Sequence, residues 1–312
     1  MIPLAEIEHA RERIAGAAVR TPLVQIPETD IWLKLECLQP VASFKIRGAT
    51  NAIRAASPKE LAGGVVTASA GNMAQGVAWA AREAGVAATI VCPDHAPQTK
   101  IDRIERLGGR VLKVPYEDWW RAIEESRYDG AEGLFVHPVQ DELVMAGNGT
   151  IGLELLEDLP DVDTVLVPYG GGGLVSGIAS AVKAQRPDVR FYVCEPETGA
   201  AAEAAFASGG PAEVEYTPSF VDGAGSRRVL DSMWPRVSEL VDGGFAVSLD
   251  DAAAAVRLLA ERIRVIAEGA GALAPAVALS ERAGSGTIAC IVSGGNIDLP
   301  VLARILAGET PK

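Results

Sequence analysis

The stretch DTVLVPYGGGGLVSGIA, residues 163–179, passes from an apolar run through four consecutive glycines, Gly170 to Gly173, into a run with helical spacing. The apolar run predicts a buried strand, and the run after the glycines predicts a helix. Glycines at such a junction leave several backbone N–H groups free to point at one ligand, and a helix N-terminus adds partial positive charge. Glycine runs also occur as ordinary surface turns, but this one is short and enclosed between strand and helix. It therefore predicts an anion site that suits a phosphate.

Strands and helices are expected to alternate on both sides of this junction. Short buried strands are predicted at residues 65–69, 87–91, 110–114, 134–136, 163–168, 191–194 and 288–292, and helices at 72–84, 99–107, 149–157 and 250–267, with another after the glycines. This alternation is typical of βαβ units and a mostly parallel sheet, and strands without polar alternation predict helices on both faces. Residues 200–222 show weak periodicity and are expected to form an irregular excursion. Ligands in such sheets bind at the carboxyl ends of strands.

The composition argues against several classes of protein. A formal net charge of −13 over 312 residues argues against nucleic acid or an anionic membrane surface as a partner. No uncharged apolar stretch reaches about 18 residues, so no membrane span is predicted, and residues 1–8 carry no secretion signal. The four cysteines are far apart and the three histidines are isolated, so neither a disulfide framework nor a metal site is predicted. We expect a reduced, cytoplasmic protein.

A second informative segment is Ser43-Phe44-Lys45-Ile46-Arg47-Gly48, near the start of a helix-like run. Lys45 stands among small and apolar residues. A lysine in a desolvated pocket loses basicity and becomes a nucleophile that can form a Schiff base. Because Arg47 follows closely, the segment taken alone is at least as well explained as a solvated basic helix start.

Two serine-containing turns also follow predicted strands. Ser69-Ala70-Gly71-Asn72 leaves backbone N–H groups and two polar side chains free to bind a carboxylate or a ring hydroxyl, although Ser and Asn are also ordinary helix caps. Ser293-Gly294-Gly295-Asn296 offers a hydroxyl that could donate to an unprotonated ring nitrogen, or forms a simple turn. A lysine, a phosphate cradle, a carboxylate loop and a serine for a ring nitrogen together match the needs of pyridoxal 5′-phosphate.

With these motifs in this order, the sequence resembles the fold-type II pyridoxal phosphate enzymes, specifically the serine/threonine dehydratase and serine racemase group. The resemblance runs from about Thr21 to Asp298 and includes Lys34-Leu35-Glu36 beside the motifs quoted above. It implies an α/β fold like that of tryptophan synthase β, with two open, mostly parallel twisted sheets and helices on both faces. It also implies a large cofactor-binding domain of residues 1–50 and 142–312, a small mobile domain of residues 51–141, and a homodimer.

The resemblance implies a role for each motif. Lys45 would form the Schiff base with the cofactor and act as the catalytic group, and Phe44 would pack against the ring. Asn72 would hydrogen-bond the ring 3-hydroxyl, and Ser293 would meet the pyridine nitrogen. The phosphate would lie against Gly170, Gly171, Gly172, Gly173 and Leu174, and the substrate against Ser69, Ala70, Gly71, Asn72 and Met73.

By the same resemblance, we expect a lyase that converts a β-hydroxy amino acid, such as threonine, serine or 3-hydroxyaspartate, to a 2-oxo acid and ammonia. The freed Lys45 amine would take the α-proton, and the cofactor phosphate would protonate the leaving hydroxyl. The racemases of the group have a serine where this chain has Ala70, so this position favours the lyase. An amino-acid racemase and a β-replacement transferase of the same fold are the alternatives.

The chain departs from the family pattern at several positions. Met73 replaces a histidine common in the dehydratases, which would alter the substrates that fit, although Met73 is equally well explained as core packing. Val41-Ala42 and Asn148 replace a Thr-Gly pair and a glutamine. Glu195 matches one ligand of a divalent-metal site found in some relatives, but Gly199 to Ala201 stand where the acid is expected, so no tight metal site is predicted. We also expect no C-terminal regulatory domain.

Overall fold

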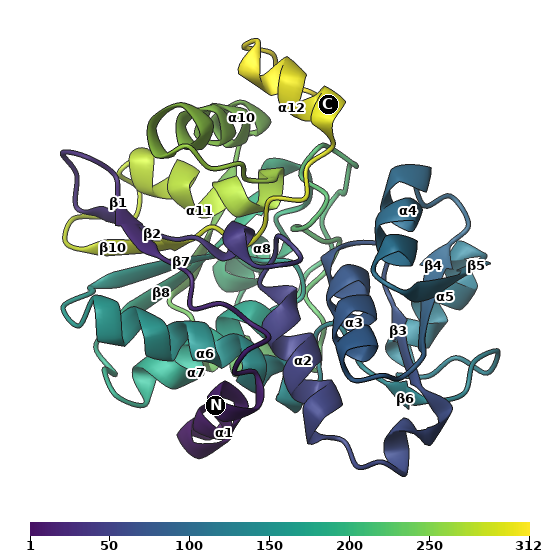
Figure 1. Ribbon diagram of the computed structural model, residues 1–312. Coiled ribbons are helices and arrows are strands. Elements are labelled where there is room, and N and C mark those ends of the chain that lie inside the picture. The colour runs from purple at the N-terminus through teal and green to yellow at the C-terminus, as the bar shows by residue number, and fades with distance from the viewer.

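The computed structural model describes residues 1–312 and contains two β-sheets (Figure 1). The larger sheet has six strands in the order β1-β2-β10-β7-β8-β9, and the smaller has four in the order β5-β4-β3-β6. All neighbouring strands run parallel except β1 and β2, which are antiparallel. The prediction of an α/β fold with two open, mostly parallel sheets is therefore confirmed.

The strand predictions hold for seven of the ten strands. The larger sheet consists of β1 (Leu23–Gln25), β2 (Ile31–Lys34), β7 (Thr164–Pro168), β8 (Arg190–Pro196), β9 (Gly243–Val247) and β10 (Ile288–Ile291). The smaller consists of β3 (Val65–Ala68), β4 (Ala88–Pro93), β5 (Gly109–Val114) and β6 (Leu134–Phe135). Sequence patterns missed β1, β2 and β9, because β1 is a short edge strand, β2 carries a lysine, and β9 begins with two glycines, which weaken a strand pattern.

Helices cover both faces of each sheet. On one face of the larger sheet lie α10 (Leu249–Leu258) and α11 (Gly269–Leu279), with α12 (Leu299–Leu306) packed on α10. The other face carries α1 (Leu4–Arg13), α6 (Glu142–Asp158), α7 (Gly173–Lys183), α8 (Ala201–Ser208) and α9 (Trp234–Leu240). Along β7, Val165 and Val167 join the core on this second face, while Leu166 joins the first, as the alternation of a strand requires.

The smaller sheet lies between α3 (Asn72–Glu83) and α4 (Gln98–Arg106) on one face and α5 (Tyr116–Glu124) on the other. Helix α2 (Lys45–Ala55) contacts both α3 and α6 and so connects the two halves of the molecule (Figure 1). All strands of the smaller sheet lie within the segment 51–141 that is predicted to form a small domain. The boundaries and the mobility of that domain remain predictions.

The helix predicted at 149–157 is wrong at its start, since α6 begins at Glu142. Asp141 caps it by accepting hydrogen bonds from the N–H groups of Leu143 and Val144. The glycines that made the segment look non-helical permit close helix packing, because a Cβ on Gly147 would lie only 2.6 Å from the carbonyl oxygen of Arg47 in α2.

Two further secondary-structure predictions are corrected, for residues 250–267 and for residues 200–222. The helix expected at 250–267 is α-helical only to Leu258, continues as a π-helical turn (η4, Leu259–Ile263), and stops at Arg264, whose φ is 65°. This turn sends the chain extended toward the start of α11. The excursion expected at 200–222 begins with a regular helix, α8, and is irregular only beyond Ser208.

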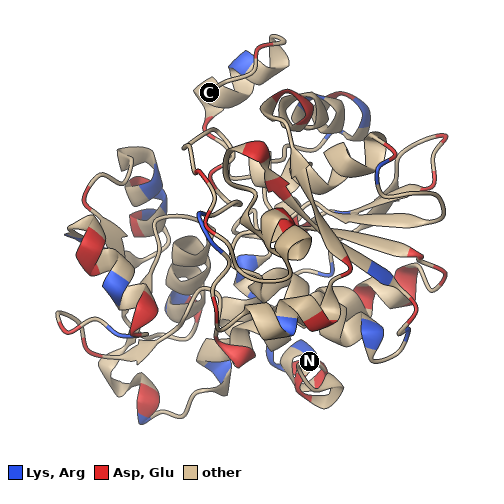
Figure 2. Cartoon of the chain, turned by 180° about the vertical axis from the view of Figure 1, so that it is seen from behind, with Lys and Arg blue, Asp and Glu red and all other residues tan.

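Charged side chains lie mainly on the outer helices and loops, whereas the strands of the larger sheet are mostly uncharged (Figure 2). None of the helices combines the length and the apolar composition that a bilayer-spanning segment requires.

Candidate active site

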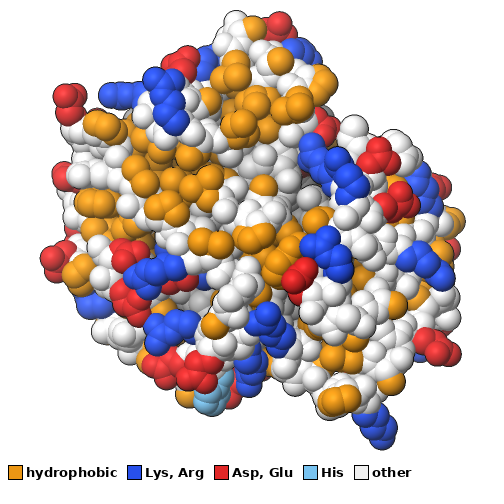
Figure 3. Space-filling model, in the orientation of Figure 1, with side chains coloured by type: hydrophobic (Ala, Val, Ile, Leu, Met, Phe, Trp, Pro, Cys, Tyr) orange, Lys and Arg blue, Asp and Glu red, His pale blue; other side chains and the backbone are white.

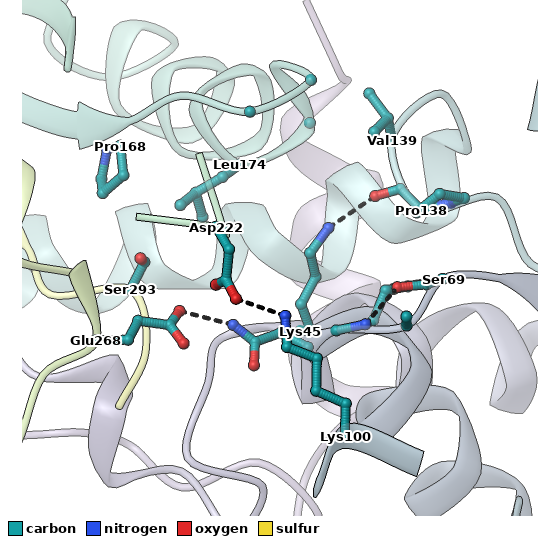
Figure 4. Close-up of a pocket in the computed structure, with 18 of the residues that line it drawn as sticks. Lys45, Ser69, Lys100, Pro138, Val139, Pro168, Leu174, Asp222, Glu268 and Ser293 are labelled. Carbon is teal, nitrogen blue, oxygen red and sulfur yellow. Dashed lines mark hydrogen bonds and ion pairs between the residues drawn. The ribbon is translucent and has the colours of Figure 1, made fainter. Parts of the chain in front are cut away.

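Strand ends from both sheets border one pocket of about 460 Å³ (Figure 4). The ends of β3 and β4 contribute from the smaller sheet, and those of β7 and β10 from the larger. Every residue singled out from the sequence for cofactor or substrate lines this pocket: Phe44, Lys45, Ser69, Ala70, Gly71, Asn72, Met73, Gly170, Gly171, Gly172, Gly173, Leu174 and Ser293. The fold thus brings the four motifs together, and the role of each residue remains a prediction.

Lys45 is the first residue of α2 and faces the pocket beside Phe44. Its Nζ donates to the carbonyl oxygen of Pro138 at 2.8 Å (Figure 4). The same Nζ lies 5.1 Å from the centre of the Phe44 ring. No carboxylate pairs with it, and burial lowers the pKa of its ammonium group to about 8. A sizeable fraction of neutral amine is therefore present near that pH, as a nucleophile or a base requires.

The glycine loop, Gly170 to Gly173, links β7 to α7. Gly172 has a φ of 93° and caps α7 without any side-chain hydrogen bond, so the first N–H groups of the helix are free for a ligand. A Cβ on Gly171 would lie 2.5 Å from Val139 Cγ2, and one on Gly173 would lie 2.8 Å from the Val139 carbonyl oxygen. A Cβ on Gly170 would meet nothing closer than 3.4 Å. Three of the four positions therefore disfavour a side chain.

The two serine turns carry polar groups into the same pocket. Ser69 Oγ accepts a hydrogen bond from the Gly71 N–H at 3.2 Å. Asn72 Nδ2 donates to Glu268 Oε1 at 2.7 Å, and Asn72 Oδ1 accepts from Asn296 Nδ2 at 2.7 Å. Ser293 follows β10, is 4% exposed, and its hydroxyl has no partner within the chain.

This set of groups fits pyridoxal phosphate. The free N–H groups of the glycine loop suit a phosphate, an amine of lowered pKa suits a covalent link to an aldehyde, and the unpartnered Ser293 hydroxyl suits a ring nitrogen. The crowding that a Cβ would meet at Gly171 and Gly173 explains why this cradle is built from backbone alone.

Three charged residues of the pocket were not predicted. Glu268 precedes α11, and burial raises the pKa of its carboxyl to about 7. Lys100 of α4 and Asp222 of the irregular segment form an ion pair across the pocket (Figure 4). The sequence offers one signal only: Glu268 is the sole charged residue in the apolar and glycine-rich run from Val265 to Leu279.

Behind Lys45 lies a buried ion network made of Lys34, Glu36, Arg47 and Glu154. Arg47 donates from Nε to Glu36 Oε2 at 2.8 Å and from Nη1 to Glu154 Oε1 at 2.7 Å, and Lys34 Nζ lies 2.6 Å from Glu154 Oε2. Arg47 is 1% exposed, so a solvated basic helix start, which the sequence also allowed, is wrong. The network ties the start of α2, and therefore Lys45, to β2 and α6.

His137 fixes the turn that faces Lys45. Its Nδ1 accepts from the N–H groups of Val139 and Gln140 at 3.0 and 2.8 Å, and Nε2 donates to the Ile123 carbonyl oxygen at 3.1 Å. Burial lowers the pKa of this imidazole to about 4, so the ring is neutral at physiological pH. Its role is structural, because it holds the Pro138 carbonyl in the position that receives the Lys45 ammonium group.

Glu195 caps α8 instead of facing the pocket. Its Oε2 accepts from the N–H groups of Ala202 and Glu203 at 2.7 and 3.1 Å, and burial raises the pKa of its carboxyl to about 8. The structure contains no group of three or more His, Cys, Asp or Glu side chains that could hold a metal ion. The absence of a tight metal site remains a prediction.

Comparison with known proteins adds independent findings. Residues 14–294 match the family model described as pyridoxal-phosphate dependent enzyme. The chain is 40% identical to the L-threonine ammonia-lyase of Thermotoga maritima, over 98% of this chain and 78% of that protein. It is 37% identical to the serine racemase of Oryza sativa subsp. indica, over 95% of this chain and 91% of that protein. It also resembles the structure of maize serine racemase, with a TM-score of 0.87 and 35% identity over 98% of this chain and 97% of that one.

Proposed function

This chain belongs to the pyridoxal-phosphate dependent enzymes, within the threonine dehydratase and serine racemase group, and we propose that it is an ammonia-lyase acting on a β-hydroxy amino acid. The products would be a 2-oxo acid and ammonia. The observation that carries this choice over a racemase is Ala70, which lines the pocket where the racemases of the group have a serine as second acid–base group. A methyl side chain can neither give nor take a proton.

The residues that would hold the cofactor come from three strand ends and from the start of α2. The glycine loop would bind the phosphate, Ser293 the ring nitrogen, Asn72 the ring oxygen, and Lys45 the aldehyde carbon. When bound, pyridoxal phosphate supplies an electron sink that acidifies the α-hydrogen of an amino acid.

Lys45 Nζ is the group that would move the α-proton. Its lowered pKa, about 8, leaves a fraction of the amine neutral and able to accept a proton near neutral pH. Once protonated, the ammonium group can donate to the Pro138 carbonyl oxygen, the partner it has in the structure. The backbone N–H groups of the turn Ser69–Asn72 would bind the substrate carboxylate, which keeps the α-carbon within reach of Lys45.

The substrate side chain would be selected by pocket residues that differ from the family pattern or come from irregular segments. Met73, Val139 and Asp222 all line the pocket. Met73 is only 2% exposed and also belongs to the core of the smaller sheet. It would therefore serve both core packing and the choice of substrate.

The test is a product assay on the purified protein loaded with pyridoxal phosphate. Serine, threonine, 3-hydroxyaspartate and phenylserine are each incubated with it, and 2-oxo acid, ammonia and D-amino acid are measured. We expect equal amounts of 2-oxo acid and ammonia from at least one substrate, and none after Lys45→Ala. D-amino acid without 2-oxo acid would overturn the proposal in favour of a racemase. The variant Ala70→Ser should gain racemisation while keeping elimination.

A homodimer and a cytoplasmic location are also proposed, on the family resemblance. All four cysteines are free and buried, which suits a reducing compartment. Apolar groups gather over the region of α10 to α12 (Figure 3), where Leu299 is 71% exposed and Leu306 45%. Sedimentation analysis of the purified protein tests the dimer.

A further inference from the structure

We propose that Glu268 is a positioning residue for the cofactor ring and that it acts through Asn72. The inference rests on the proposed function only in that Asn72 is expected to donate to the ring oxygen, and it holds whichever reaction follows. It starts from a series of hydrogen bonds that runs from Val41 through Asn296 and Asn72 to Glu268, the last two of which line the pocket.

The Val41 carbonyl oxygen determines which atom donates and which accepts in each of these hydrogen bonds. The Val41 carbonyl oxygen can only accept, so the Asn296 atom 2.9 Å from it must be Nδ2. The same Nδ2 lies 2.7 Å from Asn72, which must therefore present Oδ1 to it. Asn72 Nδ2 is left to face Glu268 Oε1 at 2.7 Å. The amide of Asn72 thus has a single orientation. One of its N–H groups donates to Glu268, and the other has no hydrogen-bond partner in the protein.

The Glu268 carboxyl is rigidly placed. Its backbone N–H donates to the Gly294 carbonyl oxygen at 3.0 Å, the residue is 5% exposed, and its side chain is directed at Asn72 through the hydrogen bond between them. A Cβ on Gly294 would lie 2.4 Å from Glu268 Oε1 and 3.3 Å from Asn72 Nδ2. The absence of a side chain at Gly294 therefore leaves space for the hydrogen bond between Asn72 and Glu268.

The arrangement has a consequence for the cofactor. An Asn72 amide turned by 180° would present an oxygen instead of an N–H to the ring oxygen, and two acceptors repel. Glu268 and Asn296 prevent this turn, one by accepting and the other by donating. Because Asn72 begins α3 and Glu268 precedes α11, the contact also joins the smaller sheet to the larger at the cofactor. Lys100 and Asp222 are the other charged groups near Glu268.

The test compares Glu268→Ala and Glu268→Gln in the protein loaded with pyridoxal phosphate. We expect Glu268→Ala to weaken cofactor binding about tenfold and to shift the pH midpoint of the visible cofactor absorbance by about one unit, the size of one buried hydrogen bond. Glutamine also accepts a hydrogen bond at Oε1, so Glu268→Gln should restore both values to near those of the parent protein. Neither readout depends on turnover, so a failed lyase assay leaves this test intact.

Two kinds of control separate positioning from general disruption. Glu195→Ala removes an equally buried carboxyl that lies outside the pocket, and it should leave the absorbance midpoint unchanged. If Glu268→Ala fails to fold, as judged by circular dichroism, Gly294→Ala and Asn296→Ala disturb the same series of hydrogen bonds and should give the same shift. The double variant Asn72→Ala/Glu268→Ala should shift no further than Asn72→Ala alone. An unchanged midpoint and affinity in Glu268→Ala, or additive shifts in the double variant, would refute the proposal.

Discussion

Lys34 and Lys45 are both withdrawn from bulk water, and their surroundings differ in the charge they face. Lys34, at the end of β2, is 0% exposed, lies 2.6 Å from Glu154 Oε2, and donates to the Thr21 carbonyl oxygen at 2.7 Å. Lys45, at the start of α2, meets only the Pro138 carbonyl oxygen, and burial lowers the pKa of its ammonium group to about 8. A reactive amine therefore requires burial without a counter-charge, since burial lowers the pKa of Lys45 and no carboxylate offsets it.

The largest expected effect follows removal of the unpaired lysine. Lys45→Ala should reduce 2-oxo acid formation by more than about a thousandfold, because it would remove both the proposed covalent link to the cofactor and the proposed proton acceptor. The visible absorbance of the bound cofactor should disappear with it. As a matched control, Lys34→Met should keep that absorbance, since Lys34 does not line the pocket. Loss of the absorbance in Lys34→Met but not in Lys45→Ala would reverse the comparison.

The next largest effect is a loss of stability when the carboxylate that pairs with Lys34 is removed. Glu154→Ala leaves Lys34 without its carboxylate and Arg47 with Glu36 alone. We expect it to lower the free energy of unfolding by about 3–5 kcal/mol, measured by urea denaturation. Glu157→Ala, on the same helix, is the control. Its carboxylate is 45% exposed where it pairs with Arg11 and Arg20, so the loss there should stay below about 1 kcal/mol.

The two lysines should also differ in their accessibility to chemical modification. In the cofactor-free protein, modification of Lys45 by an amine-specific reagent should rise through pH 8, while Lys34, whose side chain is 0% exposed, should stay unmodified until the chain unfolds. Peptide mass spectrometry separates the two sites. The pKa of Lys45 is about 8 when folded and 10.5 ordinarily, so between these values the unfolded chain binds more protons. Lys45 should therefore make the free energy of unfolding rise with pH in that window. A midpoint near 10.5 for Lys45 would contradict its unpaired environment.

Lys100 is paired like Lys34 and lines the pocket like Lys45, and its removal should have the smallest effect of the three. Its side chain is 22% exposed and pairs with Asp222, which is 52% exposed. A pair so open to solvent is worth at most about 1 kcal/mol. Lys100→Ala should accordingly change stability little and raise the KM for substrate a few-fold through the altered pocket wall. A loss of cofactor absorbance in this variant would mean that Lys100 has a role closer to that of Lys45.

The sequence predicted those parts of the fold and the site that are carried by contiguous residues. The glycine loop, the two serine turns and Lys45 were found because each motif follows a strand or opens a helix within a few residues. The start of α6 was missed because Gly147 and Gly149 serve contacts with other helices, which a local pattern cannot reveal. The strands β2 and β9 were missed for another reason, because a lysine in β2 and two glycines at the start of β9 weaken a strand pattern.

The unpredicted site residues depend on contacts between distant segments. Lys100 and Asp222 are separated by 122 positions in the chain, and Asn72 and Glu268 by 196. Nothing in the neighbourhood of either partner specifies the other. The π-helical turn before Arg264 precedes the extended segment that leads to Glu268, and no local residue pattern marks it.

The position of β10 in the larger sheet has a consequence for how the chain acquires its structure. Cys290 of β10 pairs with Leu33 of β2 on one side and with Leu166 of β7 on the other, so these early strands meet only through residues 288–291. The smaller sheet, in contrast, uses strands from Val65 to Phe135 alone. During synthesis the smaller sheet can form early, whereas β2 and β7 keep unpaired inner edges until nearly the whole chain has emerged. Exposed edges of this kind invite pairing with other chains, so the period before β10 is added is when this protein is most open to aggregation.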